Sequence, residues 1–213
     1  MNIISTLSDE LGISQAQTEK TVTLIDDGNT IPFIARYRKE ATGSMDDQTL
    51  RALDERLSYL RKLDDQKETV HNSITEQGAM TPEIAAALEK AKTLAEVEDI
   101  YRPYKPKRKT RASIARARGL EPLAARLLEQ RPEDEPALLA RQYITEEVPD
   151  TEAALAGARD ILAEGFSDSA NLRATLRSLY NATALVESKA AKKDTDSVYS
   201  GYYDYSEPAA KMA

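Results

Sequence analysis

The chemistry that the sequence offers most clearly is positive charge, concentrated in the stretch DIYRPYKPKRKTRASIARARGLEPL from Asp99 to Leu123. Between Asp99 and Glu121 this stretch holds no acidic residue, although the 213-residue chain has a net charge of -7. A local excess of one sign in a chain of the other sign indicates a separate role. Lysine and arginine neutralise phosphates and release counterions. We therefore expect phosphate contacts from a set of six cations: Arg102, Lys105, Lys107, Arg108, Lys109 and Arg111.

The backbone of this stretch should change from a loop to a helix. Pro103 and Pro106 fix φ and lack an N–H donor, so the first half is expected to be an extended loop. We call residues 102–111, which hold the six cations, the basic loop. From Thr110 the pattern becomes helical, and Gly119 can end that helix in a left-handed cap. An alternative to phosphate binding is that the loop cations pair with acidic faces of neighbouring helices, while Tyr101 and Tyr104 pack inward.

A helix-turn-helix outline covers residues 111–130, in ASIARARGLEPLAARLL. Small residues would let the two helices approach, and Gly119 would allow the turn. The second helix, from Glu121, would read bases, but it offers only Arg126, beside Glu121 and Glu129. A structural helical hairpin is therefore favoured over sequence-specific reading of DNA.

A second mixed segment is TIPFIARYRKEATGSMD, from Thr30 to Asp46. Its apolar residues are expected in the core: Ile31, Phe33, Ile34 and Ala35. Its cations are expected to be exposed or paired: Arg36, Arg38 and Lys39. Such segments usually anchor loops to a core, which is the favoured interpretation. The alternative is a nucleic-acid-binding surface shared with the basic loop.

The parts that enzymes need are scarce. The chain has no cysteine, which excludes disulfides and thiolate chemistry, and His71 is its only histidine. The aspartate pairs at positions 26–27, 46–47 and 64–65 are interpreted as helix-terminal or solvated carboxylates, since no nearby ligand completes a metal site. No glycine-rich phosphate loop is present. We expect no catalytic residue, no metal and no cofactor.

The elements that must position these residues are helices, and the expected class is all-α and multihelical. A long helix should run from Asp46 or Asp47 to Gly78, with a leucine stripe from Leu50 to Leu63. The last helix should begin near Asp168 and follow a heptad pattern: Leu172, Leu176, Leu179, Thr183, Val186 and Ala190. The Leu50 to Leu63 stripe is its expected partner, so that two long helices form a spine with the small hairpin attached. No strand is expected before Asp196.

The expected organisation is a helical region over residues 1–188 and a linker or tail over residues 189–213. The tail contains Tyr199, Tyr202, Tyr203 and Tyr205. These tyrosines could stack on bases, but docking against another domain is favoured because Asp204 and Glu207 repel phosphates. No apolar run reaches the roughly 18 to 20 residues that span a bilayer, and no secretion signal is apparent. A cytoplasmic protein without membrane contact is expected.

The segment TIPFIARYRKEATGSMD, read together with EDIYRPYKPKRKTRASIARARGLEPLA, resembles the Tex family of bacterial transcription accessory proteins. The resemblance covers the chain up to the YYDYSEP tail. It implies a multihelical N-terminal region that, in complete members, precedes an RNase H-like domain, helix-hairpin-helix elements and a C-terminal S1 RNA-binding domain. Those later modules are absent from these residues, so the chain looks like an N-terminal fragment. Eukaryotic relatives are elongation factors that also handle histones.

These observations predict a non-catalytic region that binds RNA or DNA without sequence preference. Its partners would also include the remaining domains of the same protein and the transcription machinery. The alternative is a domain-docking module that does not bind nucleic acid itself.

Overall fold

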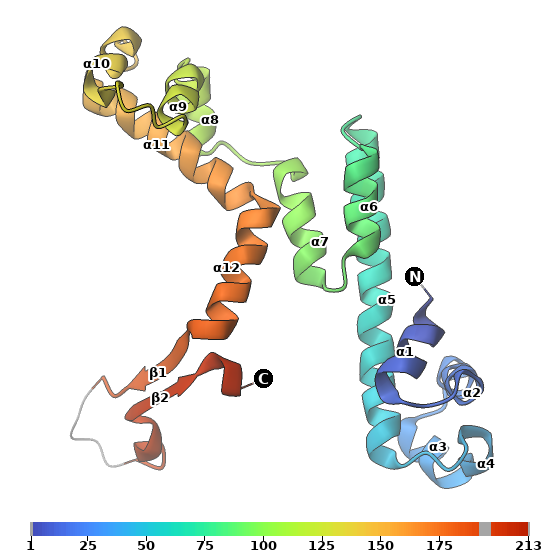
Figure 1. The fold of residues 1–213 in the computed structure, drawn as a ribbon. Helices are drawn as coiled ribbons and strands as arrows, with labels where there is room; N and C mark the ends of the chain where they lie inside the picture. The colour runs from blue at the N-terminus through green and yellow to red at the C-terminus, as the bar shows by residue number, and fades with distance from the viewer. Residues whose placement is uncertain (1, 192–196, 213) are drawn as a thin grey trace. The chain divides into compact units, whose positions relative to one another are not determined.

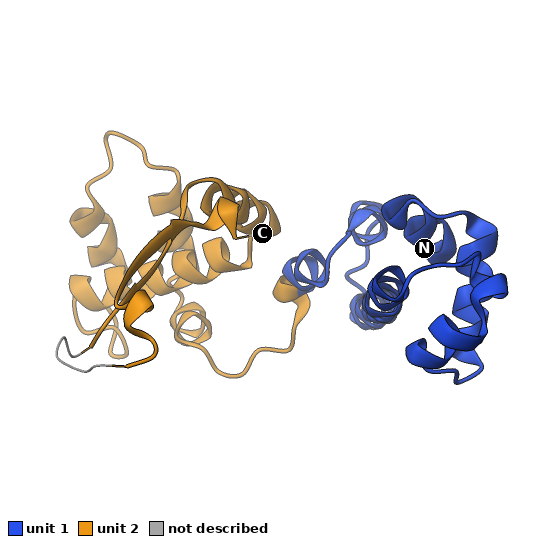
Figure 2. Ribbon diagram, turned by 90° about the horizontal axis from the view of Figure 1, so that it is seen from below, with its two compact units in different colours: residues 1–101 blue, residues 102–213 orange. Residues whose placement is uncertain are grey.

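The computed structural model describes residues 2–191 and 197–212. The chain divides into two compact units, residues 1–101 and residues 102–213 (Figure 2). Helices dominate both units, and the described strands form one two-stranded sheet. The predicted all-α class is therefore confirmed in the main. In the described part of the chain, no helix is both long enough and apolar enough to cross a membrane.

Unit 1 is built along one long helix, α5 (Figure 1). Its helices are α1 (Ile3–Leu11), α2 (Gln15–Asp26), α3 (Ile31–Tyr37), α4 (Lys39–Thr42), α5 (Asp47–Glu76), α6 (Pro82–Lys90) and α7 (Leu94–Tyr101). The leucine stripe of α5 is buried, and α1, α3 and α7 pack on α5. Burying this stripe supplies the core of the unit.

The helix starts in unit 1 follow the expected capping chemistry. Ser14 and Gln17 form a reciprocal capping box at the start of α2. The Asp46 carboxylate accepts a hydrogen bond of 2.6 Å from the backbone N–H of Thr49, which caps α5. Thr81 caps α6 in the same way, directly before Pro82. These predicted helix boundaries are confirmed.

Unit 2 is built around α11 (Figure 1). Its elements are the short 3₁₀ turn η1 (Arg102–Tyr104), α8 (Arg111–Ala117), α9 (Glu121–Leu128), α10 (Pro136–Ala140), η2 (Arg141–Tyr143), α11 (Thr151–Asp168), α12 (Ala170–Thr183), β1 (Leu185–Lys189), η3 (Ser200–Tyr202), β2 (Asp204–Pro208) and η4 (Ala209–Lys211). The core joins α8, α9 and α10 to α11, mainly through alanine and leucine. Gly119 lies at φ 76° between α8 and α9, as the sequence predicts.

The predicted heptad helix is wrong beyond Thr183. Ala184 adopts an extended conformation, with ψ 146°, and ends α12. Val186 lies instead in β1, which pairs antiparallel with β2 in a register that sets Leu185 opposite Pro208. The prediction of no strand before Asp196 is therefore wrong. The two paired segments are separated along the chain, so a local pattern could not reveal them.

The expected partner for α12 is also not supported. The Leu50 to Leu63 stripe is buried within unit 1, where α1, α3 and α7 cover it. Leu172, Leu176 and Leu179 of α12 remain 37–54% exposed. The expected boundary between the helical region and the tail, after residue 188, falls inside β1.

Candidate nucleic-acid interface

The basic loop is held in place because α8 packs very closely on α11. A Cβ atom at Gly157 of α11 would lie 2.3 Å from Cδ1 of Leu120 and 3.3 Å from Cβ of Ala115. Ala115 and Ala158 are buried in the same contact. Small side chains on both helices therefore permit the approach. The N-terminus of α8, and the loop before it, lie along the C-terminal half of α11 (Figure 1).

That half of α11 presents acidic residues at four-residue steps, which lie on one face of a helix. We call them the acidic stripe: Asp160, Glu164 and Asp168. The central member, Glu164, contacts three side chains, those of Arg116, Thr110 and Lys107. It accepts a hydrogen bond of 2.7 Å from Nη1 of Arg116 and one of 2.9 Å from Oγ1 of Thr110.

Two of the predicted phosphate-binding residues, Arg102 and Lys107, pair with the C-terminal members of the stripe, Glu164 and Asp168. Nζ of Lys107 forms ion pairs with Asp168 and, at 3.5 Å, with Glu164. Nε of Arg102 lies 3.4 Å from Asp168, and its Nη2 donates a 3.3 Å hydrogen bond to Ser167. Arg102 and Lys107 thus follow the alternative interpretation, in which loop cations meet an acidic helix face.

The electrostatics of Glu164 reflect these contacts. The hydrogen bond from Arg116 lowers the pKa of the Glu164 carboxyl, and partial burial works in the opposite direction. The bond from Thr110 and the charge of Lys107 lower it further. The same pair raises the pKa of Arg116. Glu164 therefore stays ionised and anchors the loop.

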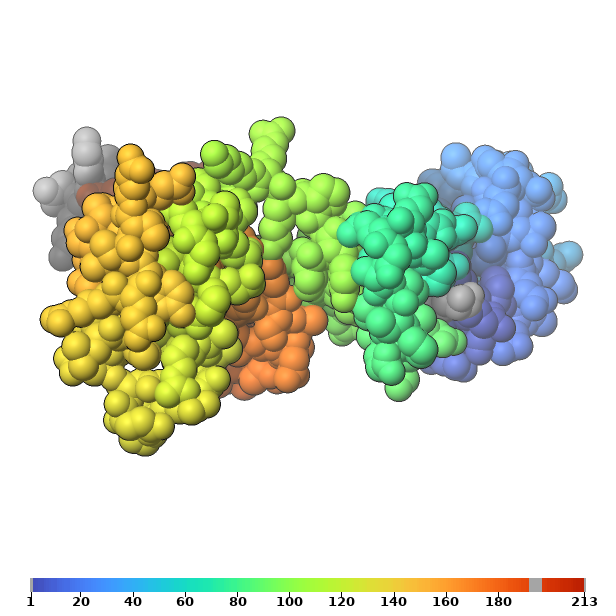
Figure 3. Space-filling view, turned by 90° about the horizontal axis from the view of Figure 1, so that it is seen from above, coloured from blue at the N-terminus to red at the C-terminus, as the bar shows by residue number. Residues whose placement is uncertain are grey.

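The other four predicted cations of this stretch are exposed. Arg108 and Lys109 are exposed, and neither forms an ion pair with any residue that the structure describes. Arg111 lies 3.6 Å from Asp160, yet its side chain is 87% exposed. Lys105 is exposed as well. Figure 3 shows side chains of the segment just after residue 100 standing out from the surface.

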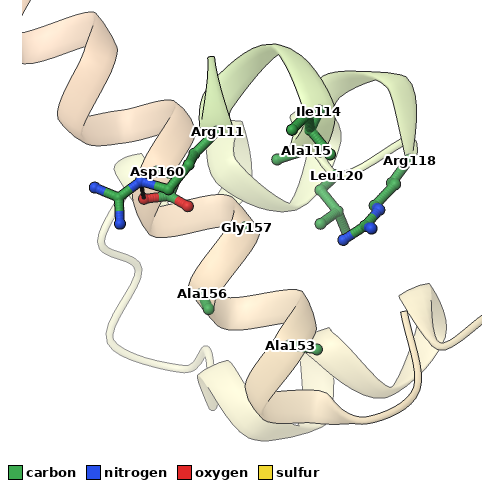
Figure 4. A pocket seen from close by; sticks show the side chains of 9 residues that line it. All are labelled: Arg111, Ile114, Ala115, Arg118, Leu120, Ala153, Ala156, Gly157 and Asp160. Atoms are coloured by element: carbon green, nitrogen blue, oxygen red, sulfur yellow. Dashed lines mark ion pairs between the residues drawn. The ribbon is translucent and has the colours of Figure 1, made fainter. Parts of the chain in front are cut away.

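A pocket of about 390 Å³ lies beside the close α8–α11 contact (Figure 4). Its floor is formed by small and apolar side chains around Gly157, and Arg111 and Arg118 border it. Arg118 is 3.8 Å from Glu147, in an exposed ion pair. Both arginines at the border of the pocket therefore have a carboxylate partner, Asp160 for Arg111 and Glu147 for Arg118.

The one cation of α9, the helix that would read bases, is Arg126, and its guanidinium group forms ion pairs. Nε of Arg126 lies 2.7 Å from Asp134, and its Nη1 lies 3.1 Å from Glu129. Leu123 faces the core of unit 2. Both α8 and α9 pack on α11, and the one cation of α9 is held in ion pairs.

The second predicted cluster lies in unit 1, whereas the basic loop belongs to unit 2. Arg36, Arg38 and Lys39 are all exposed, at the end of α3 and the start of α4. Ile34 is fully buried as expected. The core assignment of Phe33 is wrong, because this side chain is 37% exposed whereas its neighbour Ile34 is fully buried.

Sequence reasoning missed the acidic stripe and Tyr37. The stripe has a readable signal, since Asp160, Glu164 and Asp168 follow one another at four-residue steps, although the sequence predicted a new helix from about Asp168. Tyr37 lies four residues after Phe33, on the same helical face.

The predicted carboxylate pairs have structural roles where contacts are seen. Asp26 forms a 2.8 Å ion pair with Arg61, and Asp46 caps α5. Within residues 2–191 and 197–212, no group of three or more potential metal ligands comes together. His71 is exposed on α5.

Fold and site together define a helical module with a basic loop anchored on an acidic helix face. Residues 1–75 match the family model described as Tex-like protein N-terminal domain, and residues 131–213 match the one described as Tex central region-like. The chain belongs to the Tex family, as its sequence motifs suggested.

Curated bacterial relatives match along nearly the whole chain. Transcriptional accessory protein Tex of Neisseria gonorrhoeae is 47% identical over 214 residues, which cover 100% of this chain and 28% of that protein. Protein tex of Bordetella pertussis is 48% identical over 210 residues, covering 97% of this chain and 26% of its own. The human S1 RNA-binding domain-containing protein 1 is 35% identical over 130 residues, or 61% of this chain and 13% of that protein. The chain thus spans little more than a quarter of the length of its bacterial relatives.

Proposed function

We propose that this chain is the non-catalytic helical scaffold of a transcription accessory protein and contacts the phosphate backbone of RNA or DNA. The contacts are made by Arg108 and Lys109, which extend into solvent, together with Lys105 and Arg111, whose side chain stays 87% exposed beside Asp160. Arg102 and Lys107 hold the loop on α11. The binding is independent of sequence, and the protein acts in the cytoplasm.

One observation carries the proposal. The loop is fixed by ion pairs at Arg102 and Lys107, whereas Arg108 and Lys109 extend into solvent without a described ionic partner. A loop fixed in this way presents its free cations at little further entropic cost, which favours binding. The occupied ion pairs of Arg126 support backbone contact over base reading.

The names of two relatives are consistent with this proposal. One is named for transcription accessory activity and another for an S1 RNA-binding domain. Each name belongs to a much longer protein, so the proposal for this chain rests on its own basic loop.

The test measures binding of fluorescein-labelled single-stranded RNA and DNA, and of the matching duplexes, across a salt series. The variant Arg108→Ala/Lys109→Ala should lose affinity for all sequences alike. Its log–log salt slope should decrease in magnitude by about 1.4 on single strands, since each phosphate contact contributes about 0.7.

A matched control removes two exposed cations from α5 and α6, Lys62→Ala/Lys90→Ala, and so changes the net charge equally. This control should keep most of the wild-type slope. Equal losses in both variants would contradict a local site. A loss confined to one sequence would contradict backbone contact.

The second candidate is a domain-docking module, and a specific observation favours it. Leu172, Leu176 and Leu179 form an exposed apolar face on α12, and Tyr199 and Tyr202 are exposed in the following tail. Exposed apolar and tyrosine side chains are typical of protein interfaces. Partners would be the remaining domains of the same protein or the transcription machinery. Leu176→Ser would then weaken association with the rest of a full-length Tex protein and leave oligonucleotide binding unchanged.

A further inference from the structure

We propose that Phe33, Tyr37, Arg36 and Arg38 form a second nucleic-acid site, located in unit 1, on which unpaired bases of a single strand stack. We call these four residues the aromatic cluster. The inference rests on the proposed function for its ligand class but not for its location, because the basic loop lies in unit 2. Stacking is also a different kind of contact from the phosphate pairing assigned to the loop.

The aromatic cluster is exposed because only one side of α3 is buried against the core. Ile34 is 0% exposed and faces the core, and α3 packs on α5. Phe33 and Tyr37 are four residues apart and share another face of the helix. Their ring centroids lie 5.2 Å apart, with the rings tilted by 46°. Phe33 is 37% exposed and Tyr37 is 63% exposed, so the pair offers ring surface to solvent.

Hydrogen bonds and burial fix the C-terminal end of α3, the helix that carries the two rings. The N–H of Arg38 donates to the carbonyl of Ile34, which closes α3. Directly afterwards, Thr42 of α4 is fully buried, and its carbonyl accepts a 3.3 Å hydrogen bond from Nε2 of Gln17 on α2. A platform whose backbone is already ordered loses little entropy on binding.

One arginine lies over each ring. The guanidinium carbon of Arg38 lies 5.6 Å from the centroid of Phe33, and that of Arg36 lies 6.0 Å from the centroid of Tyr37. These distances are near the outer limit of a cation–π contact. The guanidinium groups can therefore reach phosphates beside a base that rests on the rings.

The charge of the cluster is not neutralised locally. No acidic residue occurs between Asp27 and Glu40. Across the described residues, Arg36, Arg38 and Lys39 take part in no ion pair, in contrast to Arg102 and Lys107 on the acidic stripe. Exposed aromatic rings among unpaired cations match the chemistry of single-stranded nucleic acid. A protein partner would need a concentration of acidic residues to fit the same surface. In a duplex the bases are already stacked, so they cannot use the rings.

The test compares Tyr37→Ala with Tyr180→Ala in the 213-residue chain. Both tyrosines are 63% exposed on helices, and Tyr180 lies on α12, outside the cluster. The probes are a fluorescein-labelled 20-nucleotide single strand and its duplex, measured by anisotropy at low salt. Tyr37→Ala should weaken single-strand binding about fivefold or more, since base–aromatic stacking is lost. Duplex affinity should change less than about twofold. Tyr37→Phe, which keeps the ring, should bind as the wild type does.

Several results would overturn the inference. Equal effects of Tyr37→Ala and Tyr180→Ala would show that the cluster contributes no stacking, and the same would follow from equal losses on single strand and duplex. The loop variant Arg108→Ala/Lys109→Ala separates the two proposals. If that variant weakens binding while Tyr37→Ala does not, the aromatic cluster fails and the loop stands. The reverse pattern supports the cluster and contradicts the loop. A wild-type chain that binds neither probe contradicts both.

Discussion

Replacing Glu164 by glutamine tests how the basic loop is anchored. In the wild type this carboxylate accepts hydrogen bonds from Arg116 and Thr110 and lies 3.5 Å from Lys107. A hydrogen bond to a charged group contributes about 1.5–3 kcal/mol, and glutamine retains one acceptor oxygen but no charge. The Arg116 side chain is 35% exposed, which favours the lower end of the range. We therefore expect a loss of about 1–2 kcal/mol in the free energy of unfolding.

The same substitution should strengthen nucleic-acid binding, because Arg102 and Lys107 keep their ion pairs with Asp168 and the loop stays fixed. It removes a negative charge from beneath the loop and releases Lys107 and Arg116 from one of their carboxylate partners. One unit charge at about 8 Å from a phosphate is worth about 0.5 kcal/mol in water. That energy corresponds to about a twofold gain in affinity at low salt. Stability and affinity would then change in opposite directions.

Urea unfolding followed by circular dichroism gives the stability, and oligonucleotide anisotropy at low salt gives the affinity. Glu68→Gln is the control, since Glu68 is exposed on α5 and shows no ion pair with the described residues. It should change stability by less than about 0.5 kcal/mol. If Glu164→Gln is as stable as this control, the anchoring contacts do not hold the loop. Weaker oligonucleotide binding in Glu164→Gln would contradict the charge argument.

The pKa of Glu164 lies below its ordinary 4.5 in the folded chain, so its contribution to stability is present above that value and lost as pH falls through the lowered pKa. The difference in unfolding free energy between the wild type and Glu164→Gln should therefore shrink from about pH 5 to about pH 3 in a urea titration. Gly157→Ala should be less stable than Gly165→Ala by about 1–3 kcal/mol. Both substitutions gain the same helix propensity in α11, but of these two positions Gly157 alone lacks space for a Cβ. Equal melting temperatures for the two variants would contradict the close α8–α11 contact. Leu57→Ala should cost about 2–5 kcal/mol and Leu179→Ala less than about 1 kcal/mol, because Leu57 is 2% exposed and Leu179 is 54% exposed; a large loss at Leu179 would show that α12 is covered.

The helical parts of the fold were predictable because their signals are local. Ser14 with Gln17, and Thr81 with Pro82, marked helix starts that the structure contains. The stripe from Leu50 to Leu63 marked the buried face of α5. Caps and 3.6-residue periodicity depend on neighbours within a few positions, so a single sequence is enough to read them.

The sheet and the heptad pattern were not predictable in the same way. The apolar positions of α12 continue into Val186 at heptad spacing, but Ala184 leaves the helix and β1 pairs with a strand that follows η3. That pairing is settled by a contact distant in sequence, which periodicity does not encode. Phe33 was assigned to the core for a related reason. Hydrophobicity alone does not say which side of a short helix meets the core.

The sequence predicted which cations belong to the candidate site. It did not predict which of them anchor the loop and which extend into solvent. Charge alone made Arg102, Lys107, Arg108 and Lys109 equivalent. The acidic stripe separates them, since two of these residues meet α11 and two point outward. The partner carboxylates lie about 60 residues further along the chain. Only the close packing of α8 at Gly157 brings them beside the loop.

The central claim is that outward cations of the basic loop contact a nucleic-acid backbone, and the salt dependence of binding tests it most directly. Affinity of the chain for a single-stranded oligonucleotide should fall linearly with salt on a log–log plot. Arg108→Ala/Lys109→Ala should reduce the magnitude of that slope by about 1.4. A wild-type slope near zero, or a slope that the loop variant leaves unchanged, would contradict the account.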